Sequence, residues 1–290
     1  MLFTRRVRTR RDKEDDRTRH IVEVRAQTGI VFLTYRRSAP VGALQTIVAN
    51  EDPLYDFSAS DGVQHTVWRA GAQHAHALVD AFAEIDALYI ADGHHRAASA
   101  ARAREELKRQ RGGAGDANSF IAVAFPDDQV QILPYHRVVK DLGGRTAEQF
   151  YSAIREKFAV RDGSAVPQRK GEVSMFLAGH WYAIGLDGVP PADASRAASL
   201  DVARLQRGVL EEILGIMDIT TDKRIDFVGG ARGTAVLERA VNSGKAAVAF
   251  SMYPVSVDDL IAISDDGGIM PPKSTWFEPK LRDGLLVHLV

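Results

Sequence analysis

The sequence contains no cysteine, and its charges are nearly balanced, with 37 basic and 38 acidic residues among 290. Without cysteine, disulfides, thiolate-bound metals and thiol nucleophiles are excluded, so covalent catalysis would need another group. The charge balance provides no general attraction to nucleic acid or to an anionic membrane. Neither a signal peptide nor the roughly 20-residue apolar run of a membrane helix is readable. We therefore expect a cytoplasmic protein.

Helix-like and strand-like segments alternate along the chain, which predicts a mixed α/β fold in two lobes. Residues 10–25 mix acidic and basic side chains and predict a solvated helix, whereas the β-branched and aromatic run 30–35 predicts a strand. Residues 119–125 and 130–135 read as two strands joined by a Pro-Asp-Asp turn. We expect these two strands to pair as a hairpin.

The sharpest local motif follows the apolar strand 87–91, where a glycine turn leads directly into a helix rich in Ala, Arg, Glu and Leu. A helix start offers unpaired N–H groups and a positive dipole end to an anion, and the glycine allows a phosphate to approach. The arginine adds a fork of donors, the two histidines can donate or shuttle a proton, and the aspartate can accept a proton or hold a divalent ion. The alternative interpretation is an aspartate that caps the helix, beside two surface histidines. The motif consists of Asp92, Gly93, His94, His95 and Arg96.

A second cluster, residues 268–281, is dense in proline, aromatic and cationic residues. Two consecutive prolines stiffen the approach to a lysine and two hydroxyls, which are groups that suit phosphate and magnesium. The alternative is a rigid loop that packs Trp276 and Phe277 into the core. The candidate phosphate ligands are Lys273, Ser274 and Thr275.

Two weaker candidates lie at the ends of predicted strands. His136 and Arg137 follow an apolar strand and could reach the same site, although polarity at a strand end explains them equally well. The glycine turn 229–230 is a further anion candidate, but it lacks the glycine spacing of dinucleotide-binding folds. No metal site built from protein ligands alone is predicted.

Four segments together resemble the bacterial family catalogued as domain of unknown function ten-fifteen: residues 10–17, 89–96, 133–137 and 270–280. The Asp-Gly-His-His-Arg element is similar to the phosphate-binding loop of the ParB and sulfiredoxin superfamily, which includes free serine kinases. The resemblance implies a ParB/sulfiredoxin-like core over residues 1–140 and a second mixed α/β lobe over residues 141–290. It also implies that the loop 268–281 returns to the site.

The resemblance further implies a nucleotide-dependent kinase that binds ATP or ADP with Mg²⁺ and phosphorylates a small hydroxyl-bearing substrate such as free L-serine. In such an enzyme Asp92 would act as the base or hold the metal, and His94 and His95 would contact the transition state. Arg96 and Lys273 would clamp the phosphates, because phosphoryl transfer depends mainly on positioning and charge stabilisation.

Two departures from the family pattern support a different function. Relatives carry a further N-terminal segment, and they have a His-Glu pair before the first motif, where this sequence has Arg6-Val7. If that glutamate is the general base, the sequence is either a truncated version of such a kinase or a non-catalytic, nucleotide-binding regulatory module of ParB-like type. A third candidate is an interaction protein whose polar loops only cap helices. The sequence leaves open the acceptor, the preferred nucleotide and a homodimer.

Overall fold

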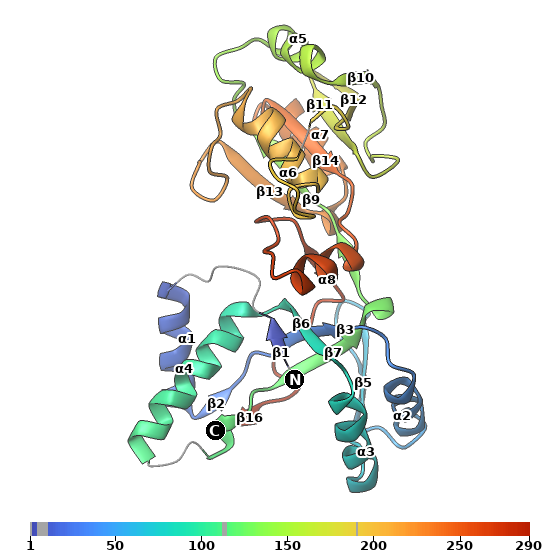
Figure 1. Ribbon diagram of the computed structural model, residues 1–290, viewed down its shortest axis with the longest axis vertical. Helices are drawn as coiled ribbons and strands as arrows, with labels where there is room; N and C mark the ends of the chain where they lie inside the picture. The colour runs from blue at the N-terminus through green and yellow to red at the C-terminus, as the bar shows by residue number, and fades with distance from the viewer. Residues whose placement is uncertain (1, 5–10, 112–114, 190) are drawn as a thin grey trace. The chain divides into compact units, whose positions relative to one another are not determined.

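The computed structural model describes residues 2–4, 11–111, 115–189 and 191–290, which fold into two compact units (Figure 1). The described part of the first unit comprises residues 2–4, those from Arg11 to Val130, and Leu281–Val290. The second unit comprises Gln131–Lys280. Both units combine helices with β-sheet, so the predicted mixed α/β fold class is confirmed.

The first unit is built on a four-stranded mixed sheet in the order β1-β6-β3-β7. The central pair β6–β3 is antiparallel, and the outer pairs β1–β6 and β3–β7 are parallel. The central strand β3 is buried throughout and consists of Val, Phe, Leu, Thr and Tyr, residue types that suit a sheet covered on both faces. The four strands are β1 (Leu2–Thr4), β3 (Val31–Tyr35), β6 (Ala87–Asp92) and β7 (Ala122–Pro126).

Four helices belong to this unit, and the predicted charged helix is one of them. Its buried residues Glu14, Thr18 and Ile21 are spaced as one helical face, so it is packed on one side rather than fully solvated. This face lies against the helix that follows the glycine turn (Figure 1). Ser99 Oγ of that helix donates to the Glu14 carbonyl at 3.2 Å. The helices are α1 (Arg11–Val24), α2 (Ala39–Ala49), α3 (Ala72–Ala83) and α4 (His94–Arg111).

Two short strand pairs and two 3₁₀ turns complete the first unit. The hairpin pairs β4 (Tyr55–Ser58) with β5 (Gln64–Val67), and β2 (Ala26–Gln27) pairs with β16 (His288–Leu289) near the end of the chain. The 3₁₀ turns are η1 (Gly115–Asn118) and η2 (Asp127–Gln129).

The second unit contains a six-stranded, fully antiparallel sheet in the order β10-β12-β11-β14-β9-β13. Its central strands β11 and β14 are buried throughout. A separate two-stranded ladder joins β8 to β15. The strands are β8 (Gln131–Leu133), β9 (Tyr135–Val139), β10 (Ala159–Asp162), β11 (Glu172–Leu177), β12 (His180–Gly185), β13 (Ile225–Gly229), β14 (Val248–Met252) and β15 (Trp276–Glu278).

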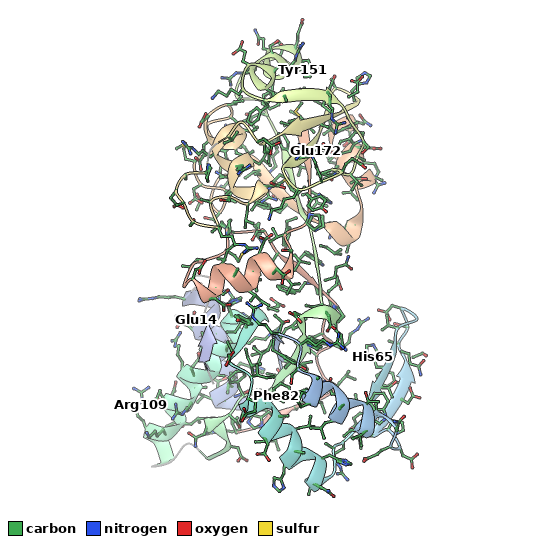
Figure 2. The ribbon with its side chains drawn as sticks, turned by 45° about the vertical axis from the view of Figure 1, so that its right-hand side comes forward. Glu14, His65, Phe82, Arg109, Tyr151 and Glu172 are labelled. Atoms are coloured by element: carbon green, nitrogen blue, oxygen red, sulfur yellow. The ribbon has the colours of Figure 1, made fainter. Side chains whose placement is uncertain are left out.

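Helices cover this second sheet and complete its core. Tyr151, labelled on α5 in Figure 2, packs against Tyr182 of β12 with ring centroids 4.7 Å apart. Thr146 and Gln149 form a capping box at the start of α5. The elements are α5 (Ala147–Lys157), α6 (Asp201–Leu205), which continues as a π-helical turn η3 (Gln206–Glu211), η4 (Gly230–Arg232), α7 (Ala235–Asn242) and α8 (Val257–Asp265).

The predicted hairpin between residues 119–125 and 130–135 is wrong. Strand β7 pairs in parallel with β3, whereas β8 pairs with β15, which lies far along the chain. The segment between them forms the 3₁₀ turn η2 instead of a hairpin turn. The alternative pairing places Ile132 opposite Phe277, and both side chains are buried. Burial of this apolar pair explains why β8 pairs with β15 instead of with β7, its neighbour in the sequence.

No helix in the described ranges has the length and apolar character needed to cross a membrane.

Candidate functional site

The junction between β6 and α4 places the Asp-Gly-His-His-Arg motif at the C-terminal end of an inner strand of the first sheet. The β3–β6 pairing shifts register there, because Phe32 lies opposite Asp92 while Leu33 lies opposite Ile90. Such a bulge locally bends the strand and re-aims its side chains. Asp92 is consequently exposed although it ends a buried strand.

Gly93 makes the sharp turn from strand to helix. Its φ of +92° lies in the region that side-chain-bearing residues rarely adopt, and a Cβ there would lie 3.3 Å from the Val31 Cα. The Gly93 carbonyl accepts the N–H of Ala97 at 3.0 Å, so α4 begins at once. His94 and His95 stand in the first turn of α4 and are half-buried. The predicted order of strand, glycine turn and helix is confirmed.

Arg96 is fixed in place by the chain before β3. Its Nη1 donates to the Ile30 carbonyl at 2.7 Å, and a Cβ on Gly29 would come within 3.2 Å of the Arg96 Cδ and Nε. Gly29 therefore makes room for the arginine side chain. The bond to Ile30 uses one of five guanidinium N–H groups, which leaves further donors for an anion.

Arg96 also lines a cavity of about 210 Å³ inside the first unit. Arg17 and His20 from α1 line it as well, and Asp283 is its acidic lining residue. Sequence reasoning missed Arg17 and His20, although their i, i+3 spacing places them on one helix face. The lining residues are Arg17, His20, Ile21, Gln27, Thr28, Gly29, Val31, Arg96, Phe120 and Asp283.

In the second unit, His136 lies in the sheet interior and is buried. Its Nδ1 accepts the backbone N–H of Met252 at 3.2 Å, a role that requires the neutral ring. Burial, with a smaller contribution from the charge of Arg137, lowers the pKa of His136 from 6.5 to about 4. In this conformation the histidine supports the β9–β14 pairing.

The adjacent Arg137 is only 2% exposed, and burial lowers its pKa to about 10. Its guanidinium donates to the carbonyls of Tyr135 and Lys273, the latter at 3.2 Å, and lies 5.7 Å from the centroid of the Phe227 ring. Arg137 thereby fixes the backbone of the second candidate loop. The structure thus brings together two segments that sequence reasoning selected separately.

Lys273 is exposed, and its ammonium lies 5.6 Å from the Tyr135 ring centroid and 5.9 Å from that of Phe227. This residue has a positive φ of 55°, so the loop holds it in an unusual backbone conformation. Ser274 is buried and donates its hydroxyl to the Pro271 carbonyl at 2.7 Å, while Thr275 is half-buried. Phe277 is 2% exposed, as the rigid-loop interpretation expects. Lys273 is consequently the loop's accessible cation among the predicted residues.

The predicted site residues thus form two groups, one in each unit. Asp92, Gly93, His94, His95 and Arg96 belong to the first unit, and the second holds His136, Arg137, Lys273, Ser274 and Thr275. Convergence of the two groups on one ligand stays a prediction.

The family described as "Protein of unknown function (DUF1015)" matches residues 8–203. No curated protein matches the chain. Among solved structures, SbnI with a C-terminal truncation, from Staphylococcus aureus, has a TM-score of 0.50 at 12% identity, with 99% of this chain and 84% of that chain covered. This likeness concerns the fold alone.

Two further structures are more distant. A conserved hypothetical protein from Pyrococcus furiosus has a TM-score of 0.43 at 12% identity and covers 97% of this chain and 89% of its own. A free serine kinase in complex with AMP has a TM-score of 0.43 at 12% identity, with 95% and 83% covered.

Proposed function

This chain belongs to the DUF1015 family, described as proteins of unknown function, and we propose that it is a nucleotide-dependent small-molecule kinase. ATP or ADP is the proposed phosphoryl donor, and the hydroxyl of free L-serine is the proposed acceptor. The observation that carries the proposal is the β6–α4 junction, where a left-handed glycine, a helix start and a fixed arginine adjoin a cavity with basic residues.

Each part of the junction suits the phosphates of a nucleotide. The start of the 18-residue helix α4 presents backbone N–H groups and the positive end of the helix dipole. Gly93 has no side chain to keep a phosphate away, and Arg96 offers a pre-positioned fork of donors. Arg17 and His20 add basic groups in the cavity. We therefore propose that the phosphates bind beside Gly93 and Arg96, next to the α1 residues Arg17 and His20.

Asp92 is the proposed ligand for Mg²⁺. The described residues contain no cluster of three histidine or acidic side chains that could hold a metal by themselves. Mg²⁺ in phosphoryl-transfer sites is commonly held by one or two carboxylates together with substrate phosphates and water. A single exposed carboxylate beside the phosphate site fits this mode of binding.

In the proposed reaction, the serine hydroxyl oxygen forms a bond to the terminal phosphorus of the nucleotide. The bond from that phosphorus to the bridging oxygen breaks, and the nucleotide leaves as ADP from ATP or as AMP from ADP. Asp92 or water accepts the hydroxyl proton, and His94, His95 and Arg96 stabilise the charge on the transferring group. Lys273, in the loop 268–281 that Arg137 fixes, is the proposed second clamp.

The resemblance of the Asp-Gly-His-His-Arg loop also supports a ParB/sulfiredoxin-like core for the first lobe. In this proposal the protein works in the cytoplasm. The Asp-Gly-His-His-Arg loop and the loop 268–281 bind the same phosphates.

The proposal is tested by incubating the purified full chain with Mg²⁺, L-serine and either ATP or ADP, and following the products by phosphorus NMR. We expect phosphoserine together with stoichiometric ADP or AMP. Asp92→Asn should abolish product while nucleotide still binds, and omission of serine should leave the nucleotide intact. Absence of phosphoserine with both nucleotides would contradict the kinase function.

The second candidate is a nucleotide-binding regulatory module without catalysis. The Arg6-Val7 pair favours it, because relatives have a His-Glu pair at this place and that glutamate is a candidate general base. It predicts saturable nucleotide binding in calorimetry, no product, and a change in self-association. Failure of both nucleotides to bind would contradict both candidates.

A further inference from the structure

A second cavity, of about 420 Å³, lies within the second unit and plays no part in the proposed reaction. Its walls come from the segment before β11, the turn after β12, the turn before α6, α6 itself and α8. Segments distant in sequence thus bring several charged side chains together around this cavity. The charged lining residues are Lys170, Asp187, Arg196, Asp201, Arg204 and Asp259.

Asp259 fixes two of the cations. Its side chain is 4% exposed, and it accepts bonds from Lys170 Nζ at 3.0 and 3.1 Å and from Arg196 Nε at 3.0 Å. Burial alone would raise the pKa of Asp259, but the hydrogen bonds from Lys170 and Arg196 lower it below its usual value. The carboxylate therefore stays charged and holds both cations at the cavity wall.

Asp201 is also buried, but it is bound differently. Both of its oxygens accept the backbone N–H of Gly171, at 2.9 and 3.0 Å. Burial raises the pKa of this carboxyl, and the nearby charges of Lys170 and Arg204 oppose that rise only in part. Asp201 therefore fixes the Gly171 backbone at the cavity wall and partly balances the charges of Lys170 and Arg204.

Arg204 is half-buried and lines the cavity. Its Nε is shielded from solvent, and within the described residues it has no hydrogen-bond acceptor. A buried donor without an acceptor is costly, most of all when the group is charged. A cation that lines the cavity thus has a donor that the described chain leaves without an acceptor.

The local charge is positive once internal pairs are counted. Asp187 pairs with Arg169 at 3.0 Å, so the remaining wall sets three cations, Lys170, Arg196 and Arg204, against two carboxylates. A guanidinium with available donors beside a fixed lysine and a fixed arginine matches an oxyanion.

We propose that this cavity binds a small organic oxyanion, whose carboxylate or phosphate group accepts hydrogen bonds from Arg204 and from the remaining donors of Lys170 and Arg196. The site is separate from the β6–α4 junction, because it lies wholly within the second unit. Its occupation does not depend on the kinase function.

The test measures thermal unfolding and calorimetric binding of the full chain with inorganic phosphate and, separately, with succinate. Binding to the native state raises the unfolding midpoint as the ligand concentration rises. Arg204→Gln should weaken binding of the preferred anion at least about tenfold, equivalent to about 1.4 kcal/mol. A preference for phosphate identifies a phosphomonoester site, and a preference for succinate identifies a carboxylate site.

The matched control is Arg207→Gln, one turn further along the same segment, where the guanidinium lies 3.8 Å from Glu212. It should leave anion binding unchanged. Without anion, Arg204→Gln should still unfold cooperatively, so that a loss of anion binding reports the lost contact and not an unfolded variant. Absence of binding by both anions, or equal binding to the Arg204→Gln variant, would overturn the proposal.

Discussion

Arg96 and Arg137 show how one residue type serves two purposes in this protein. Arg96 is half-buried, has one bond to a carbonyl and lines a cavity. Arg137 is fully enclosed and bonded to two carbonyls, so it fixes the Lys273 loop. Both residues follow a predicted strand in the sequence, and burial, which separates their roles, arises only from tertiary packing. The sequence therefore indicated both arginines but could not distinguish them.

Replacing Arg96 tests the proposed phosphate contact. Arg96→Ala removes a charged donor from the junction, so the affinity for ATP or ADP should fall at least about tenfold, equivalent to about 1.4 kcal/mol. Calorimetric titration measures the change. Arg104→Ala, further along α4 where the side chain bonds Asn118 at 3.0 Å, should leave the affinity unchanged. Equal affinities for Arg96→Ala and wild type would remove Arg96 from the site.

The turn at Gly93 can be tested through stability. Gly93→Ala forces a side chain into a backbone with φ of +92° and should lower the free energy of unfolding by about 1–2 kcal/mol. Urea denaturation measures this change in the free energy of unfolding. Gly42→Ala is the control, because Gly42 lies in α2 with no atom within 4 Å of its ideal Cβ position, and it should be neutral or stabilising. An unstrained, fully stable Gly93→Ala variant would contradict the turn geometry.

At the scale of elements, the sequence predicted structures that depend on neighbouring residues correctly, but it did not predict pairings between segments far apart in the chain. The strand 87–91, the glycine turn and the following helix were all predictable, because their signals lie within a few residues. The partner of β8 was not, because the burial of Ile132 against Phe277 depends on a segment far along the chain. Nothing local distinguishes that pairing from a hairpin across the Pro-Asp-Asp turn. The packed face of α1 was missed for the same reason, since its partner α4 lies elsewhere in the sequence.

The ladder between β9 and β14 should be sensitive to acid through His136. Its folded-state pKa of about 4 lies below 6.5, so between these values the unfolded chain binds a proton that the folded chain excludes. The stability is therefore fully present above pH 6.5 and falls as the pH drops toward 4, by up to about 3 kcal/mol.

Urea midpoints measured between about pH 7 and about pH 5 test this linkage. His136→Gln cannot titrate, so its stability should fall less over that range than the stability of the wild type. Other groups titrate in both proteins, and the difference between the two curves isolates the histidine. Parallel curves would show that His136 does not titrate as proposed.

At the scale of the molecule, the first unit is assembled from distant parts of the chain. The strand β16 pairs with β2, the Val290 N–H donates to the Arg25 carbonyl at 2.9 Å, and Arg282 pairs with Asp61. The sequence suggested lobes of residues 1–140 and 141–290, whereas the second compact unit starts at Gln131 and the last residues belong to the first. A prediction that divides the sequence at a single point cannot assign the last residues to the same unit as the first ones.

Removing residues 281–290 should therefore weaken the first unit selectively. Loss of the β2–β16 ladder and of the Val290 bond should reduce the free energy of unfolding of that unit by about 1–3 kcal/mol, at about 1 kcal/mol for each hydrogen bond. Hydrogen exchange of the β3 amides measures the loss, and the β11 amides of the second unit are the internal control. Unchanged protection of β3 would contradict a structural role for the C-terminal residues.

The central claim is that nucleotide phosphates bind at the turn between β6 and α4. NMR of the full chain with isotope-labelled glycine, titrated with ADP and Mg²⁺, tests it most directly. The account predicts that the amide signals of Gly93 and of Gly29, which adjoins Arg96, shift together along one saturable binding curve. Saturable binding of ADP that leaves both signals in place, or no binding at all, would contradict it.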